Sequence, residues 1–591
     1  MIINNTKQWW QEDDEHVHTS VFSYVNAIEN KQSYRDVLNM RHLRLYGNTD
    51  GYNSAGYRYF RNEPTSALQH TVTMNIVQSM VDTVTSKITK NKPKPSFLTT
   101  GGDWSLQSRA KKLTQFINGQ FDKTKIYKAA SAAFKDSCIL GTGAIKIFRN
   151  GNSVCVERVF SPELIIDDNE AVYGEPRQLH QIKYIHQDVL VQMFPDKEDE
   201  IRMISENAAI LGINNTFDPS SRMVKVVESW HLPSGVEAED GKHCISINNA
   251  LLWSEKWEKS YFPFVFYKWS ERPLGFFGQG IAEQLTGLQL EINKILRTIQ
   301  ISMHLVSVPK LLVEASSKIV PAHLNNKIGG IIKYVGKPPT YAALGSVPPE
   351  LFLHLDRLYT RSFEVIGVSQ LSAQSTKPSG LNSGKALRTY NDLESERFLE
   401  VSYRYEQSFI EATKMFIDIA KDIDEDLDGK YEVNSVSGKF LSTIKWSDVH
   451  MDEDTYSMQV FPTSALSGTP SDRLADIQEL LAAGFISKED GMKLLDFPDL
   501  QQFYKFNNSG SDDIDRTIEL IVEKEEYQSP EPYQNLELGI IKMQQAYLYY
   551  KTVGLGENAL ELFRRWMVDA NVLLKKAVPQ QQPPVPENIN T

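Results

Sequence analysis

The chain has 591 residues, and because single hydrophobic cores stop growing at roughly 250–300 residues, we expect about two to four structural units. Apolar residues make up 41% and charged residues 23%, as in a folded protein rather than a disordered one. The formal net charge of −12 argues against tight clamping of DNA phosphates as the main role, since such affinity comes from lysine and arginine.

Cysteine spacing and hydropathy exclude further classes of protein. The three cysteines, Cys138, Cys155 and Cys244, are too far apart for a disulfide framework or a zinc site, which suggests a reducing compartment. The first twenty residues are acidic and polar, unlike a signal peptide. No apolar run approaches the ~18–20 residues of a membrane span. We therefore expect a soluble, intracellular protein with no membrane partner.

The sequence up to about residue 270 predicts helices followed by a sheet. Helical patterns cover 20–45, 66–90 and about 105–140, and the second has Val72, Ile76, Met80 and Val84 four apart before Pro93 and Pro95. Alternating strands flank a turn at 149–152, a strong hairpin signal. Further strand-like segments lie at 181–187, 222–232, 242–253 and 261–269.

A long helix with one apolar seam follows, about 26 residues and ~40 Å long. The seam comprises Ile281, Leu285, Leu288, Ile292, Ile295, Ile299, Met303 and Val306. Pro309 ends the helix, and short strands at 310–315 and 329–336 lead to a second helix at 349–367.

The last 220 residues begin with a glycine-rich loop and a helix from about 384 to 423. Extended segments are expected at 430–462 and a helix pair at 470–498. Three helical patterns then lie at 512–527, 533–551 and 557–577, before a Pro/Gln-rich tail that we expect to be disordered.

The loop KPSGLNSGKALRTY (377–390) superficially resembles the phosphate-binding loop of a nucleotide hydrolase. That motif requires Gly, four residues, Gly-Lys and then Ser or Thr for magnesium. Gly380 leaves only three residues before Gly384, and Ala386 stands where the hydroxyl belongs. A connector before a helix, with Ser383 as a possible N-cap, is the better interpretation.

Two other motifs fail on their chemistry. Asp424, Asp426 and Asp428 match the first half of an EF-hand calcium loop, but Ser435 stands where a bidentate Glu is needed, so calcium is a weak candidate beside an acidic helix-to-strand turn. The second helix of the 470–498 pair begins Ser-Lys-Glu-Asp, too acidic to read a DNA groove. No Ser-His-Asp set, paired-carboxylate site or other metal cluster is evident, so we predict a non-enzymatic protein without a cofactor.

The order of these segments resembles the portal proteins of tailed bacteriophages over roughly residues 20–575. Four stretches carry the resemblance: SMVDTVTSKITKNKPKPSF (79–97), DSCILGTGAIKIF (136–148), GQGIAEQLTGLQLEINKILR with VPKLLVE (278–314), and LLAAGFISKEDGMKLLDFPD (480–499). These stretches resemble the family in their general sequence pattern, and they are not catalytic motifs.

The resemblance implies an α+β portal fold with an α/β wing, a long-helix stem, a small α/β clip and a helical crown. The wing would comprise 1–270 and 386–500, the stem 280–308 and 348–368, the clip 309–347, the tunnel loop 369–385, the crown 510–578 and the disordered tail 579–591.

It also implies a ring, usually of twelve subunits, at one capsid vertex. Double-stranded DNA would pass through it during packaging and ejection, and terminase, major capsid and scaffold proteins and a neck or tail adaptor would bind it, in the host cytoplasm during assembly and then in the virion. We expect Lys377, Ser379, Ser383, Lys385 and Arg388 to face DNA, with Lys294 and Arg297 on the stem. Lys310, Glu314, Lys318, His323 and Lys327 are candidates for terminase or adaptor contact.

Two alternatives remain open: another structural virion component, such as a neck or internal core protein, and a nucleotide-dependent enzyme using the loop at 380–386.

Overall fold

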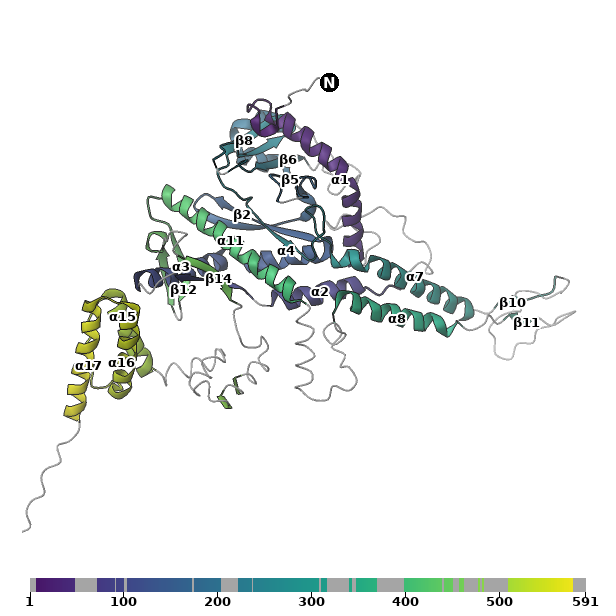
Figure 1. Ribbon diagram of the computed structural model, residues 1–591. Helices are drawn as coiled ribbons and strands as arrows, with labels where there is room; N and C mark the ends of the chain where they lie inside the picture. The colour runs from purple at the N-terminus through teal and green to yellow at the C-terminus, as the bar shows by residue number, and fades with distance from the viewer. Residues whose placement is uncertain are drawn as a thin grey trace, which may run out of the picture. The chain divides into compact units, whose positions relative to one another are not determined.

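The computed structural model describes residues 7–47, 72–90, 92–99, 104–172, 175–203, 222–235, 237–307, 310–315, 340–342, 347–368, 398–437, 440–449, 456–461, 477–478, 481–482 and 509–577 (Figure 1). The chain divides into two compact units. The first comprises 1–89, 125–148 and 155–408, and the second comprises 90–124, 149–154 and 409–591.

The first unit combines helices with two antiparallel sheets. Its helices are α1 (Val17–Gly47), α2 (Ile76–Thr89), α4 (Ile126–Leu140), α5 (Gln187–Met193), α6 (Glu198–Arg202), α7 (Ile281–Ser307) and α8 (Pro349–Ile366). Its sheets are β4-β5-β6-β7-β8 and β3-β2-β9, and β10 (Lys310–Leu312) pairs with β11 (Thr340–Ala342). The sheet strands are β2 (Thr142–Asn150), β3 (Ser153–Val159), β4 (Leu164–Ile165), β5 (Gln178–His186), β6 (Met223–His231), β7 (Lys242–Ile247), β8 (Ala250–Lys256) and β9 (Phe264–Lys268).

The five-stranded sheet is covered on one face by α1, which lies along it in Figure 1. Val21, Val25 and Ile28 of α1 form a core with Val227 of β6 and Cys244 of β7. Because strand side chains alternate between faces, Val226, Glu228 and Trp230 of β6 lie on the other face. There Trp230 packs with Ala144 of β2 and Phe264 of β9, so a second core joins the two sheets.

The second unit contains β1 (Lys94–Thr99), α3 (Trp104–Thr124), β12 (Glu432–Ser437), β13 (Phe440–Lys445) and β14 (Tyr456–Phe461). Strand β1 pairs with β14, and β12 pairs with β13. Helix α11 (Leu399–Asp426) begins in the first unit and ends in the second. Its Phe416 contacts Phe121 of α3 at a ring-centroid distance of 5.2 Å, while Phe116 of α3 contacts Trp446 at 5.3 Å.

Three C-terminal helices, α15 (Ser509–Lys524), α16 (Leu536–Val553) and α17 (Glu557–Ala577), share one core. Phe563 and Trp566 of α17 are fully buried in it against Ile514, Met543 and neighbouring side chains. Asn535 caps α16 by accepting a hydrogen bond from the Leu538 N–H at 3.2 Å, and Gly554 ends it in the left-handed conformation.

The mixed helical and β content confirms the α+β prediction, but two helix boundaries were wrong. Residues 72–75 are not helical, and Val72 is exposed; α2 begins at Ile76 because Asn75 accepts a hydrogen bond from the Gln78 N–H at 3.0 Å as its N-cap. The helical run expected at 105–140 is broken at Lys125, which has a positive φ of 55° and separates α3 from α4.

Part of the sequence prediction falls outside the described residues: 369–397, 316–339, 578–591 and most of 470–498. Within the described ranges, every helix is too short or too polar to cross a membrane.

The C-terminal core generates a stability prediction. Phe563→Ala should lower the free energy of unfolding of the three-helix bundle by about 3–5 kcal/mol, because it removes a fully buried ring and leaves a cavity. Calorimetry of the full chain measures the change, with the exposed aromatic substitution Tyr533→Ala as the control. Equal effects of the two substitutions would contradict this core.

Candidate functional site

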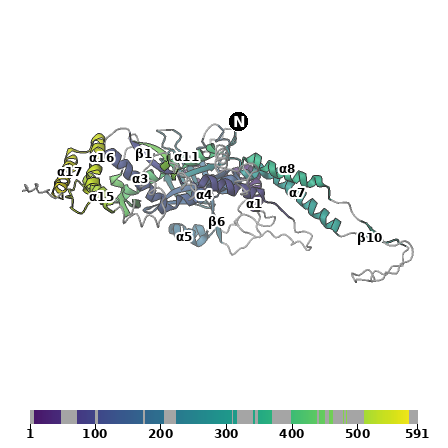
Figure 2. The ribbon, with the colours of Figure 1, turned by 90° about the horizontal axis from the view of Figure 1, so that it is seen from below.

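Helices α7 and α8 form a long pair within the first unit, side by side in both ribbon views (Figures 1 and 2). The seam of α7 is buried at Ile281, Leu285, Ile292, Ile295 and Ile299. Met303, which the sequence assigned to the seam, is 56% exposed, so the buried stripe ends before the tip of the helix.

Glycines allow the main chain to approach closely at the start of α7. A Cβ on Gly278 would lie 2.6 Å from the carbonyl oxygens of both Gly141 and Ser270, and one on Gly143 would lie 1.8 Å from that of Ala133. Real Cβ atoms do not occupy such positions, so these sites require glycine. The Gly278 N–H donates to Thr142 Oγ1 at 2.9 Å and the Gln279 N–H to the Ser270 carbonyl at 2.7 Å. We call residues 141–143 and 278–280 the glycine junction.

One buried glutamine ties α7 to α2. Gln289 Oε1 accepts hydrogen bonds from the N–H groups of Ile76 at 2.8 Å and Val77 at 3.4 Å, and its Nε2 donates to the Met74 carbonyl at 2.6 Å. The first N–H groups of a helix have no partner inside the helix, so Gln289 satisfies two of them. The contact fixes α2 against the middle of α7.

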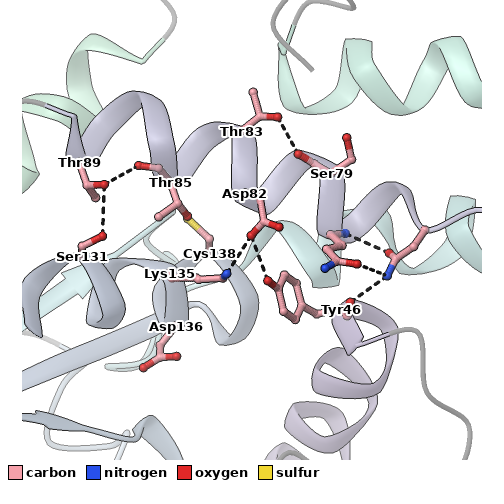
Figure 3. Close-up of polar contacts among 12 residues, drawn as sticks. Tyr46, Ser79, Asp82, Thr83, Thr85, Thr89, Ser131, Lys135, Asp136 and Cys138 are labelled. Atoms are coloured by element: carbon pink, nitrogen blue, oxygen red, sulfur yellow. Dashed lines mark hydrogen bonds and ion pairs between the residues drawn. The ribbon is translucent and has the colours of Figure 1, made fainter. Parts of the chain in front are cut away.

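Polar contacts also join α1, α2 and α4 beside this point (Figure 3). Asp82 of α2 accepts a hydrogen bond from the Tyr46 hydroxyl at 3.0 Å and pairs with Lys135 of α4 at 2.9 Å. Burial, with the hydrogen bond to Asp82, raises the pKa of Tyr46, so it remains a neutral donor. Burial raises the pKa of the Cys138 thiol on α4 to about 12, which makes a reactive thiolate unavailable.

The outer faces of the helix pair combine apolar and charged side chains. On α7, Leu290, Lys294, Arg297 and Ile301 are exposed and spaced four, three and four residues apart, so they share one face. On α8, the exposed apolar side chains are Phe352, Leu353 and Val365. Both α7 and α8 thus expose large apolar side chains that no other described part of the chain covers.

Four of the predicted stem, clip and tunnel-loop residues lie in the described part of the chain. Lys294 is on the exposed face of α7 and pairs with Glu291 at 3.5 Å, and Arg297 is one turn further along. Lys310 begins β10, opposite Ala342 of β11, and Glu314 is exposed just after that strand. Lys377, Ser379, Ser383, Lys385, Arg388, Lys318, His323 and Lys327 lie outside the described residues.

Two of the three aspartates at and just beyond the end of α11 make contacts within the protein. Asp424 Oδ1 accepts a hydrogen bond from the Tyr431 N–H at 3.0 Å, and Asp426 pairs with Arg149 at 2.5 Å. Asp428 has a positive φ of 51° in the turn that leads to β12. Across the described residues no three His, Cys, Asp or Glu side chains are arranged to hold a metal ion, and calcium binding here stays a prediction.

Sequence reasoning missed the residues that fix α7 in place. Gln289 has the i, i+4 relation to Leu285 that marks it as a seam position, but its polarity removed it from the apolar pattern. The glycines at 141, 143, 278 and 280 lie in two of the stretches that carry the family resemblance. Each pair flanks one residue, Thr142 or Gln279, and this Gly-X-Gly pattern was the available signal of a close backbone approach.

The described geometry defines an α+β protein in which a long helix pair is fixed to a two-sheet unit through a close backbone junction. The family model of phage P22-like portal proteins matches residues 54–315, a stretch that contains the glycine junction and α7. This match confirms the resemblance to phage portal proteins over that stretch, and that family is structural rather than enzymatic. The portal family implies a place in the virion capsid. No curated protein matches the chain significantly.

The junction generates a prediction with an internal control. Gly278→Ala should destabilise the first unit by about 1–3 kcal/mol, because its methyl group overlaps two carbonyl oxygens. Gly287→Ala on α7 meets no atom within 4 Å and should stabilise the helix by about 0.5–1 kcal/mol. Thermal unfolding of both variants should therefore shift in opposite directions; a shared direction would argue against the close approach.

Proposed function

We propose that this chain is the subunit of a ring at one capsid vertex, through which the genome is packaged and later ejected. The family match supports this role, and so does the helix pair. Portal rings usually have twelve subunits, and we propose the same number here.

The observation that carries the proposal is the exposed apolar face of α7 and α8. Leu290, Ile301, Phe352 and Leu353 are exposed in the single chain, although burying such a side chain contributes roughly 1.5–3 kcal/mol. Neighbouring copies bury these groups if each subunit contacts the next head to tail. Such contacts close into a ring when the rotation between copies divides the circle.

The helix pair is then the stem, at 280–308 and 348–368. We propose the wing at 1–270 and 386–500, the clip at 309–347 and the crown at 510–578, with the tail 579–591 beyond. Residues 369–385 are the proposed tunnel loop, whose Lys377, Ser379, Ser383 and Lys385, with Arg388, face DNA. A net charge of −12 suits a channel in which DNA slides without being clamped.

The proposed partners follow from this arrangement. The clip, with Lys310, Glu314, Lys318, His323 and Lys327, binds terminase during packaging and a neck or tail adaptor afterwards. The wing contacts the major capsid and scaffold proteins. The ATPase of the packaging motor is then a separate chain, and this chain needs no cofactor.

Substitution on α8 tests the subunit contact. Leu353→Glu should reduce ring formation by about tenfold or more per interface, because a charge enters an apolar contact and a tenfold change corresponds to only about 1.4 kcal/mol. Sedimentation velocity measures rings against monomers. The control is Met193→Glu, an equally exposed apolar position on α5.

Circular dichroism of both variants should match that of the original chain, since neither side chain belongs to a core. If Leu353→Glu assembles as well as the control, the helix pair is not the subunit contact. If the unsubstituted chain stays monomeric at high concentration, the ring itself is wrong.

A further inference from the structure

A chain of four charged side chains crosses the two sheets of the first unit. Lys146 Nζ of β2 lies 2.5 Å from Glu228 Oε2 of β6, and Glu228 Oε1 lies 3.0 Å from His243 Nε2 of β7. His243 Nδ1 lies 2.9 Å from Glu255 Oε1 of β8. We call these four residues the charge chain.

The hydrogen-bond chemistry of this arrangement determines the protonation of His243. A carboxylate oxygen only accepts hydrogen bonds, whereas a neutral imidazole has one nitrogen that donates and one that accepts. Each ring nitrogen of His243 faces a carboxylate oxygen, so both nitrogens have to donate. The geometry therefore requires the imidazolium cation, and the charges alternate from Lys146 to Glu255.

The charge chain is largely removed from water. The exposed fractions of the side chains are 7% for Lys146, 17% for Glu228 and 11% for His243, rising to 43% at Glu255. The His243 ring stacks on Trp230 at a centroid distance of 4.8 Å and an interplanar angle of 12°. Its edges meet Trp253 and Trp257, so these aromatic rings exclude water around the cation.

Other charged groups nearby balance one another. Lys183 of β5 pairs with Glu157 of β3, and this pair acts on Lys146 with opposite signs. His243 itself meets Glu228 of β6 and Glu255 of β8, and Lys146 of β2 pairs with Glu228. With His243 protonated the charge chain is neutral, and without the proton it holds one uncompensated negative charge among buried rings.

We propose that the charge chain is a protonation-dependent joint between the two sheets, closed while His243 is a cation and loosened when that proton is lost. Strand β2, which carries Lys146, begins at Thr142 inside the glycine junction. The charge chain therefore fixes β2, the strand whose first residue contacts the start of α7. When the charge chain loosens, the contact that positions the helix pair loosens with it. This inference does not depend on the proposed ring.

The pKa shifts agree in direction with this geometry. Burial alone would lower the pKa of His243, but hydrogen bonds to Glu228 and Glu255 and their negative charges outweigh it and raise the pKa above its ordinary value. Burial alone would raise the pKa of Glu228, but Lys146 and His243 outweigh it and lower the pKa to about 2. Because the folded state raises the pKa of His243, its stabilisation is complete below the unfolded value of about 6.5. It is lost as the pH rises through the raised folded pKa.

Hydrogen exchange of the full chain across pH 6 to 10 tests the joint. After correction for the intrinsic pH dependence of exchange, protection of peptides from 142–148, 223–231 and 242–256 should fall as the pH rises through the pKa of His243, because the stabilisation that the cation contributes is lost there. Peptides from α15–α17 serve as the internal reference, because their core contains none of these groups.

Two variants make the outcome decisive. His243→Gln should remove the pH step, while His354→Gln on the exposed surface of α8 should retain it. Glu255→Gln should move the step down by about one pH unit, because one of the two carboxylates that favour the cation is gone. Glu255 is partly exposed, so this variant keeps the fold even if His243→Gln does not. A step unchanged in Glu255→Gln, or absent from the original chain, would overturn the proposal.

Discussion

The backbone contact between residues 141–143 and 278–280 is the constraint on which the first unit depends. No side chain separates the two segments there, so the end of α4 and the start of β2 lie directly against the start of α7. Because α7 has 27 residues, a small change in the direction of its first turn moves its far end by a large distance. Glycine at these positions allows the close backbone contact, and the hydrogen bonds accepted by Thr142 and Ser270 hold it. Together they fix the direction in which α7 starts.

The other contacts of α7 reinforce this constraint from different directions. Gln289 links the middle of α7 to the first turn of α2, and Asp82 then links α2 to α1 and α4. On the other side of the junction, β2 enters the core shared by the two sheets, where Lys146 and Glu228 form the buried ion pair. The helix pair is thus fixed at its base, while its outer faces carry exposed apolar side chains.

The sequence predicted what depends on local pattern. The seam of α7, the hairpin at 149–152 and the three C-terminal helices were all evident from periodicity and turn chemistry. The error at α2 arose because Val72 fits a four-residue spacing by chance, while the N-cap signal of Asn75 was overlooked. The helix break at Lys125 could not be predicted in this way, because no glycine or proline stands at that position.

The remaining features depend on partners far apart in the sequence. Nothing near His243 indicates that Glu228 and Glu255 meet its two nitrogens, because cross-strand register decides that contact. Likewise, Gln289 gains its role only when α2 arrives more than two hundred residues away in sequence. The tunnel-loop and most clip candidates lie in parts of the chain that the structure does not describe, so they stay predictions.

An electron cryomicroscopy map of the purified, assembled chain tests the central claim most directly, because it locates the exposed faces of α7 and α8. The account predicts a closed ring with a central channel, in which Ile301 and Leu353 are in van der Waals contact with the adjacent subunit. A ring that leaves these side chains in solvent, or particles without a central channel, would contradict it.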